Sequence, residues 1–351
     1  MFNDYVVLTG LAVILFLTLI LPFSVKKVEE ELEIFLFIMG ISAVTVSNQW
    51  SFHLIHEALK EPIMISSAVL VVGLIFKAVR KYMKGWMNHL ISRFGIRTTI
   101  FIIALFLGLG SSILTAIISA LILSEVMSIL KLDKHSEIKI VVYSCFSIGL
   151  GAALTPIGEP LSTIMVAKLR GEPYHAGFFF LLKNAGIWIV PGVILSSFMA
   201  SLSAKRKIQE NNTLAEDEIE TNKTILIRAL KIYLFVMALI FLGTGLLPVA
   251  ERYIARMPTA ALYWVNSISA ILDNATLASA EVVPSMHLDQ LVFLLMGLLI
   301  SGGMLIPGNI PNIVSASKLN IKSKQWAKVA LPYGAAMMVV YFVVMYFVLE
   351  A

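Results

Sequence analysis

The stretch "ALTPIGEPLSTI", residues 153–164, carries two prolines, a glycine and a glutamate inside a long apolar segment. Proline removes a backbone donor and clashes with the preceding turn, so a helix containing this stretch is expected to break there. A second break is expected at "IPGNIP", residues 306–311, in another long apolar segment. What these breaks mean depends on the surroundings of the two segments.

The composition predicts an integral membrane protein. Hydrophobic residues make up 58% of the chain, charged residues 14%, and the mean hydropathy is +0.88. Soluble domains are about 45–50% apolar and about 25% charged. Apolar runs of roughly 17–25 residues, long enough to cross the hydrocarbon core as helix, recur along the chain. They lack the alternation of a barrel, so the expected fold class is all-α.

Four apolar regions do not fit a simple span. Residues 98–130 and 259–286 are interrupted by "GLGSS" and "ILDNAT", and we expect re-entrant hairpins that enter the membrane and leave on the same side. Residues 139–168 and 289–318 break at their proline pairs, and we expect discontinuous helices. Simple spans are expected near residues 5–23, 32–48, 62–79, 175–202, 224–248 and 327–349.

The irregular regions form an internal repeat. Aligning "GAALTPIGEPLSTIMVAKL" with "GGMLIPGNIPNIVSASKL" matches Pro156 with Pro307 and Pro160 with Pro311. A hairpin adds no net crossing, so each half crosses the membrane three times and the halves are inverted relative to each other. The expected domains are two extra N-terminal helices (1–61), a first inverted repeat (62–202), a cytoplasmic linker (203–223) and a second inverted repeat (224–351).

The basic residues predict the orientation. The chain has 27 Lys and Arg and a formal net charge of +5. Along the expected path all of them fall on one side except Lys60, Lys168, Arg170, Lys183, Arg252 and Arg256. The positive-inside rule makes the richer side cytoplasmic, which places both termini outside the cytoplasmic (inner) membrane. The basic excess is thereby an orientation signal, so the expected partners are lipid and small inorganic ions, not nucleic acid.

Two breaks at matching positions of inverted repeats point to a midplane binding site in a secondary transporter. Free carbonyls at the breaks and polar hairpin tips offer the oxygen ligands that hard cations such as Na⁺ prefer. The candidate ion- or substrate-binding residues are Asp273, Asn274, Thr276, Glu159, Thr155, Gly158, Ser111, Ser112, Thr115, Gly308, Asn309 and Asn312. The Na⁺ ligand candidates among them are Asp273, Asn274, Glu159 and Asn309.

These motifs resemble the ion transporter superfamily, which includes NhaD-type Na⁺/H⁺ antiporters, ArsB-type efflux permeases and divalent anion/Na⁺ symporters. The resemblance covers roughly residues 62–350, and "ILDNAT" is its most antiporter-like piece. It implies an ion-coupled transporter with no cofactor besides the transported ions and, by family analogy, a homodimer. The Ser-Asn-Thr tip signature of the dicarboxylate symporters is absent from "SSILT" (111–115) and "DNAT" (273–276), which argues against a dicarboxylate substrate.

The expected function is antiport of Na⁺ or Li⁺ against H⁺ by alternating access. The site region offers the carboxylates of Asp273 and Glu159 and no Lys or Arg, which favours a cation. The alternative is Na⁺-coupled symport of a small anion, a dicarboxylate or sulfate, held by helix N-termini. An enzyme is not expected, because no second catalytic group accompanies either acid in the apolar spans. A channel is more often built from several identical subunits around one pore.

Other polar residues have plainer interpretations. Glu125 and Glu281 are expected as solvated carboxylates near the outer ends of the hairpins' second arms. His53 and His56 are expected in an external loop, where their spacing alone gives weak support for a metal site. The single Cys145 has no partner for a disulfide and is expected to be a small buried residue.

Overall fold

The computed structural model describes residues 2–130, 132–204, 221–249, 258–271 and 274–349. In these ranges every regular element is a helix, with no strand. The elements are α1 (Phe2–Ser24), α2 (Lys26–Glu30), α3 (Leu32–Ser47), α4 (Phe52–Leu114), α5 (Ala116–Leu130), α6 (Lys134–Ala152), α7 (Pro160–Lys168), α8 (Phe180–Leu202), α9 (Asn222–Val249), α10 (Thr259–Val265), η2 (Asn266–Ala270), α11 (Asn274–Glu281), α12 (Leu288–Gly302), η3 (Ile306–Gly308), α13 (Ile310–Leu319) and α14 (Ser323–Leu349).

Several of these helices are suited to a membrane. Among the described residues, five helical segments are long and apolar enough to cross one. They are Phe52–Ile75, His89–Leu114, Phe180–Leu202, Asn222–Pro248 and Ser323–Leu349. Shorter apolar helices accompany them at Val6–Pro22, Leu32–Ser47, Ala116–Leu130 and Leu288–Gly302. The structure therefore bears out an all-helical protein of membrane character.

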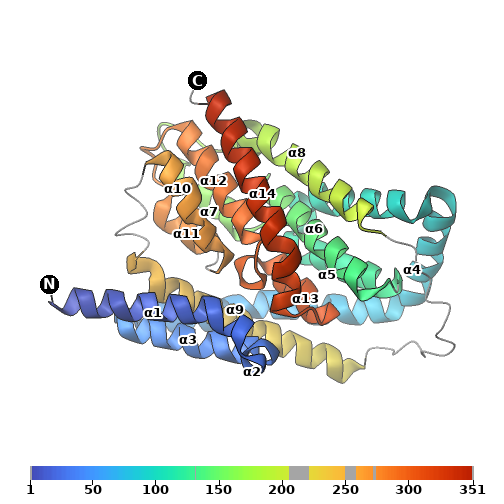
Figure 1. Cartoon of the computed structure of the whole chain (residues 1–351), viewed down its shortest axis with the longest axis horizontal. Coiled ribbons are helices and arrows are strands. Elements are labelled where there is room, and N and C mark those ends of the chain that lie inside the picture. Colours follow the sequence, from blue (N-terminus) through green and yellow to red (C-terminus); the bar gives the residue numbers. More distant parts are fainter. Residues whose placement is uncertain (1, 131, 205–220, 250–257, 272–273, 350–351) are drawn as a thin grey trace.

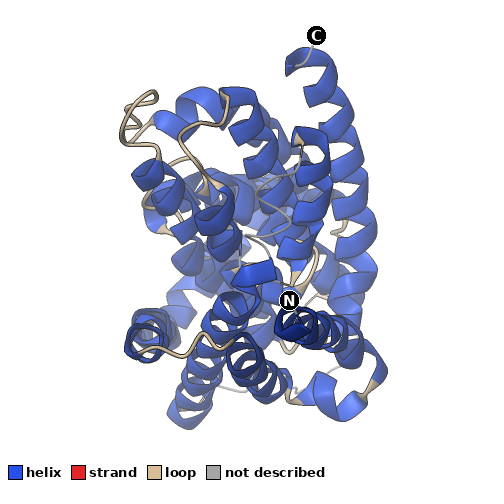
Figure 2. Cartoon of the chain, turned by 90° about the vertical axis from the view of Figure 1, so that its left-hand side faces the viewer, coloured by secondary structure: helices blue, strands red, loops and turns tan. Residues whose placement is uncertain are grey.

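The helices form two layers, visible in Figure 1. One layer consists of α1, α3, α9 and the first part of α4, which pack side by side, and Figure 2 views these helices nearly end-on. Small residues bring α3 and α9 close together, since a methyl group on Gly245 would come within 2.5 Å of the Ala43 side chain. The short α2 joins α1 to α3 in this layer. The second layer holds the remaining helices, with α6 packed against α8 and against the last part of α4.

The structure differs from the sequence expectation along α4, which is helical where a loop and a polar connection were expected. The helix begins at Phe52 because the Ser51 side chain caps it, accepting a hydrogen bond from the Leu54 amide at 3.1 Å. His53 and His56 therefore lie on a helix and not in a loop. After residue 75 the helix continues to Gly95, where a positive φ of 75° redirects the chain.

The connecting part of α4 has the composition of a helix at a membrane surface. It carries exposed aromatic side chains at Tyr82, Trp86 and Phe94, interspersed with basic residues. Aromatic and basic side chains of this kind gather where lipid headgroups meet water. In Figure 1 the teal last part of α4 returns above the blue first part.

Candidate functional site

The chain leaves helical geometry at both proline motifs. Residues 153–159 separate α6 from α7, and residues 303–309 separate α12 from α13, so each break is seven residues long. The residues that precede the two half-helices, Glu159 and Asn309, share an extended backbone with φ of −156° in each and ψ of 160° and 147°. The breaks therefore match in length and in how the chain enters the half-helix that follows.

The helix ends set the register between the two halves. A separation of 150 residues relates Ala152 to Gly302, Glu159 to Asn309 and Lys168 to Lys318. This register needs no gap, and it displaces the prolines by one position. Pro160 is the first residue of α7, whereas Pro311 is the second residue of α13, and both positions lie in a first turn that tolerates proline.

The first break packs against the chain reversal between α4 and α5. Thr115 makes this reversal with a positive φ of 72°. The Ala116 amide donates to the Gly158 carbonyl oxygen at 2.9 Å, and the Thr155 hydroxyl donates to the Ser112 carbonyl oxygen. The neighbouring segment thus satisfies backbone groups that the break has freed, as buried irregular backbone requires.

The second break packs in the same way against η2 and the start of α11. A methyl group on Gly308 would come within 2.8 Å of the Ser269 carbonyl oxygen. The Asn312 amide donates to the carbonyl oxygens of Gly302 and Leu305, each at 2.9 Å, which satisfies acceptors released at the end of α12. Within the described residues, the Asn312 side-chain oxygen and the Asn274 amide nitrogen make no hydrogen bond.

The second break lies against α6. The Asn309 amide nitrogen would be 2.8 Å from a Cβ placed on Gly149, so only glycine leaves room for this side chain on α6. Cys145 lies one turn earlier and approaches the Pro311 carbonyl oxygen at 3.7 Å. Its thiol is buried and contacts α13, which fits the structural role expected for it.

A cavity of about 360 Å³ lies where three helices begin, and we call it the half-helix cavity. It is lined by Pro160 of α7, Ile310 of α13 and Ala275 of α11. Because the first amides of a helix carry partial positive charge, three helix starts shape the potential here. The opposite wall comes from α9 and the first part of α4.

Two carboxylates on that wall were missed by the sequence analysis. Glu57 and Glu61 lie one turn apart on α4 and both line the half-helix cavity. Their spacing of four residues, following the Ser51 cap, places both carboxylates on one helix face. This spacing could have identified them only if residues 52–61 had been predicted as helix.

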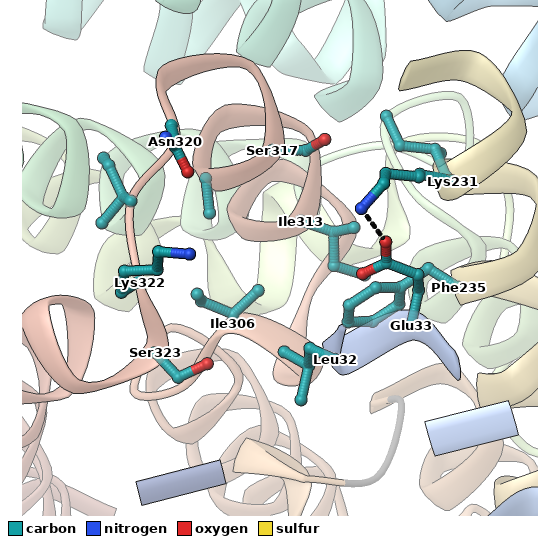
Figure 3. Close-up of a pocket in the computed structure, with 13 residues that line it drawn as sticks. Leu32, Glu33, Lys231, Phe235, Ile306, Ile313, Ser317, Asn320, Lys322 and Ser323 are labelled. Atoms are coloured by element: carbon teal, nitrogen blue, oxygen red, sulfur yellow. Dashed lines mark ion pairs between the residues drawn. The ribbon is translucent and has the colours of Figure 1, made fainter. Parts of the chain in front are cut away.

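A second cavity, of about 140 Å³, lies beside the second break. It is lined by Ile306, Ile313 and the starts of α3 and α14 (Figure 3). The Lys231 ammonium group pairs with the Glu33 carboxylate at 2.5 Å on one wall. Since Ile310 lines the half-helix cavity and Ile313 lines the second one, the two cavities meet α13 one turn apart along the same face.

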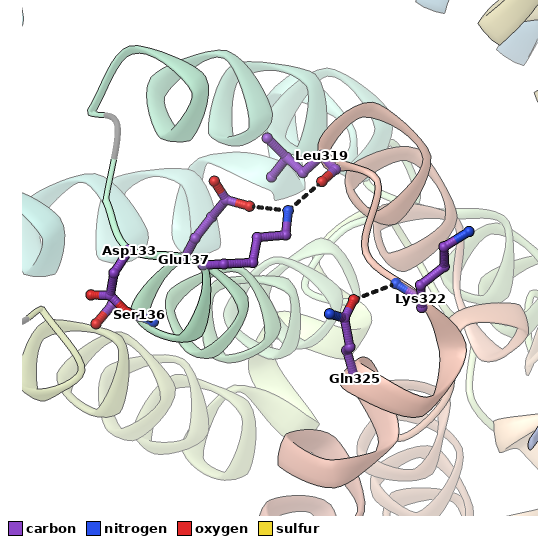
Figure 4. A network of polar contacts seen from close by, with 7 residues as sticks. Asp133, Ser136, Glu137, Leu319, Lys322 and Gln325 are labelled. Carbon is purple, nitrogen blue, oxygen red and sulfur yellow. Dashed lines mark hydrogen bonds and ion pairs between the residues drawn. The ribbon is translucent and has the colours of Figure 1, made fainter. Parts of the chain in front are cut away.

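Polar contacts hold the far end of α13 in place. The Lys318 ammonium group pairs with the Glu125 carboxylate of α5, and both side chains are buried, at 4% and 3% exposed. Lys134 at the start of α6 donates to the Leu319 carbonyl oxygen and to Glu137, each at 2.6 Å (Figure 4). The end of α13 is thus tied to α5 and α6.

Two expectations about acidic residues are wrong. Glu125 and Glu281 were expected to be solvated, yet their exposed fractions are 2% and 1%. The sequence places each near the end of an apolar run, where water is the default neighbour. The structure instead covers Glu125 with α13 and places Glu281 beside Asn266 of η2.

The other predicted site residues fall into three groups. Glu159, Thr155, Asn274, Asn309 and Asn312 are buried at the breaks or at the start of α11. Hydroxyls of the first tip serve the backbone, since Ser111 donates to the Gly108 and Ile148 carbonyls, Ser112 to the Leu109 carbonyl, and Thr115 accepts from the Ile118 amide. Asp273 and the Thr276 side chain lie outside the described residues.

The described residues hold no group of three or more His, Cys, Asp or Glu that could bind a metal ion. A family model described as "Protein of unknown function (DUF1646)" matches residues 8–348, so the chain belongs to this family. No curated protein matches the chain.

Proposed function

We propose that this DUF1646 protein is a secondary active transporter that exchanges Na⁺ or Li⁺ for H⁺ by alternating access. The observation that carries the proposal is the half-helix cavity, at which two broken helices and α11 begin and which acidic side chains line. Broken helices meeting at one site are the device by which many transporters bind ions inside the bilayer.

The matched breaks support an arrangement as two inverted repeats. Equal break lengths, equal backbone geometry at Glu159 and Asn309 and the constant separation of 150 residues are what a repeat produces. In this proposal, the segments from His89 to Leu130 and from Thr259 to Glu281 are re-entrant hairpins. Each break packs on the tip of its own hairpin, while α13 packs on α5 and α7 packs on α11 of the other repeat.

The two cavities that meet α13 one turn apart support alternating access. The half-helix cavity and the smaller cavity at Lys231 are separated by one turn of helix. A modest displacement of α13 would expose residues of the second break to one cavity or the other. An ion bound at the break would then reach opposite sides in turn.

The charges near the site favour a cation. Glu57 and Glu61 line the cavity, and Glu159 immediately precedes its Pro160. Pro160 and Ile310 follow the two breaks, where Glu159 and Asn309 provide side-chain oxygens. Binding an anion next to three carboxylates would add like charge in a medium of weak screening. Protons and cations competing for these groups would couple the two fluxes.

One observation favours the alternative, Na⁺-coupled symport of a small anion such as sulfate or a dicarboxylate. The starts of α7, α11 and α13 converge on the half-helix cavity, and helix N-termini attract anions. Proteoliposomes separate the two functions. Antiport predicts that external Na⁺ makes an acid-loaded lumen more alkaline, with no effect of sulfate or succinate. Na⁺-dependent uptake of either labelled anion without proton flux would establish symport instead.

The proposed location is the cytoplasmic membrane with both termini outside. In Figure 1 the N-terminus lies toward the left, whereas the end of α8 and the start of α9 lie toward the right. These flank the linker at residues 203–223, which carries Lys205, Arg206, Lys207 and Lys223, and the positive-inside rule places loops rich in Lys and Arg on the cytoplasmic side.

A further inference from the structure

Glu281 and Asn266 form a buried polar pair away from the helix breaks. Glu281 ends α11 and is 1% exposed, and Asn266 begins η2 and is fully buried. The two side chains are neighbours. None of their four polar atoms makes a hydrogen bond within 3.5 Å to a described residue. An arrangement of this kind is costly unless a ligand completes it.

Glu125, near the end of the first hairpin's second arm, shows how the structure accommodates another buried carboxylate. Glu125 is 2% exposed and is paired with the Lys318 ammonium group. Lys168, which matches Lys318 in the other half, donates to the Val282 carbonyl oxygen at 3.3 Å. Val282 directly follows Glu281, yet the Glu281 carboxylate accepts no hydrogen bond from Lys168.

The remaining charged groups near α11 are few. Of the helices packed on it, α12 carries Asp289 in its first turn, α9 carries Lys223, Arg228 and Lys231 in its first three turns, and η2 has no titratable group. The part of α9 that shares the half-helix cavity with Ala275 is residues 236–247, which is uncharged. Lys168 of α7, which also packs on α11, is the basic residue with a hydrogen bond next to Glu281.

We propose that Glu281 and Asn266 are a proton-binding site, in which Glu281 is a neutral carboxylic acid that donates its O–H to the Asn266 side-chain oxygen. A proton satisfies a carboxylate and an amide oxygen together without a third ligand, and it removes the cost of burying an unpaired charge. A metal cation would need several more oxygens than these two side chains offer. The site is thus suited to H⁺ and not to Na⁺.

This inference rests on the proposed function only for its role in transport, where Glu281 would carry the exchanged proton. The site lies on the same helix, α11, whose first turn lines the half-helix cavity. Gain or loss of the proton at one end of α11 would therefore accompany ion binding at the other end. Protonation itself is a property of the folded protein and is measurable without any transport.

Infrared difference spectroscopy of the full-length protein in lipid tests the site in Na⁺-free buffer at neutral pH. Glu281→Gln should remove one C=O stretching band of a neutral carboxyl group. Glu137→Gln, the control, should leave that band in place, because the Glu137 carboxylate pairs with the partly exposed Lys134 ammonium group. Asn266→Leu should shift the band to higher wavenumber, since the carboxyl group loses its acceptor.

Two results would overturn the site. A neutral-carboxyl region unchanged by both Glu281→Gln and Asn266→Leu would show that Glu281 is ionised. Loss of the band on addition of Na⁺ to detergent-solubilised Glu159→Gln protein would show that the pair itself binds the cation. If Glu281→Gln loses both the infrared band and the Na⁺-driven proton efflux, Glu281 carries the exchanged proton. If it loses the band but keeps the efflux, the proton on Glu281 is structural, and the antiport proposal stands.

Discussion

Gly151 shows how closely the first break is packed at the residue scale. A Cβ there would lie 1.9 Å from the Gly108 carbonyl oxygen of α4, a backbone atom with no freedom to move aside. Gly151→Ala is therefore expected to separate α4 from α6 and to destabilise the protein by about 2 kcal/mol or more, the range of overpacked cores.

Gly110→Ala provides a matched control on α4, because the nearest atom to the new methyl group is 3.8 Å away. It should be neutral or stabilise by up to about 1 kcal/mol through helix propensity. Thermal unfolding of both variants in detergent measures the difference. Equal melting temperatures would mean that α4 and α6 are not in contact at Gly151.

The Lys318–Glu125 pair makes a second residue-scale prediction. Glu125→Gln should cost about 3–5 kcal/mol because it removes the carboxylate that pairs with a buried ammonium group, whereas the double variant Glu125→Gln with Lys318→Met should recover most of that loss. Denaturant titration of Glu125→Gln, Lys318→Met and the double variant measures the coupling energy. Additive losses would show that the two side chains do not interact.

Residue chemistry also marks where prediction from sequence succeeds and where it stops. Glu159 and Asn309 were predicted at the two breaks because proline and glycine interrupt helices by local sterics. Glu57 and Glu61 were missed because their part in the cavity depends on α4 packing beside the half-helices, a contact between segments far apart in the chain. The burial of Glu281 was missed for the same reason.

At the scale of single elements, α6 begins with a capping residue whose charge matters. The Ser136 amide donates to the Asp133 carboxylate at 3.0 Å, and this hydrogen bond lowers the pKa of Asp133 below its ordinary value of 3.8. The ionised form is thus favoured by folding. Its stabilisation is present above the unfolded pKa and is lost as the pH falls through the lowered folded pKa.

We therefore expect Asp133→Ala to lower the free energy of unfolding by about 1 kcal/mol at neutral pH. Asp133→Asn should cost less, because it still accepts at the cap, and it should weaken the acid dependence below about pH 4. Melting temperatures across an acidic pH series measure both effects. An unchanged acid limb in Asp133→Asn would mean that the cap does not contribute to acid unfolding.

The elements also show how far periodicity and composition predict a fold. Helix type and the two breaks were predictable because apolar run length and proline act locally. The helical path through residues 80–94 was not, because a polar, basic stretch is equally consistent with a loop when the membrane surface that stabilises it is unknown. The one-residue shift of the prolines between the two halves appears only when the helix ends are known.

For the whole molecule, inverted repeats require the chain to cross the membrane an odd number of times between the loop after α7 and the linker after α8. Cysteines at Gly171 and at Ser203 should therefore be labelled from opposite sides by an impermeant maleimide, with Lys322→Cys on the same side as Ser203→Cys. Cys145 adds no background because it is buried. Labelling of positions 171 and 203 from one side would contradict the inverted arrangement.

We propose that acidic groups at the half-helix cavity bind Na⁺ and H⁺ in competition. The most direct test measures the Na⁺ concentration that gives half-maximal proton efflux from acid-loaded proteoliposomes. Competition predicts that this concentration rises as the external pH falls. It also predicts that Glu159→Gln abolishes the efflux or displaces its pH dependence, while Glu137→Gln, remote from the cavity, behaves like the wild type. A half-maximal concentration independent of pH, or full activity in Glu159→Gln, would contradict it.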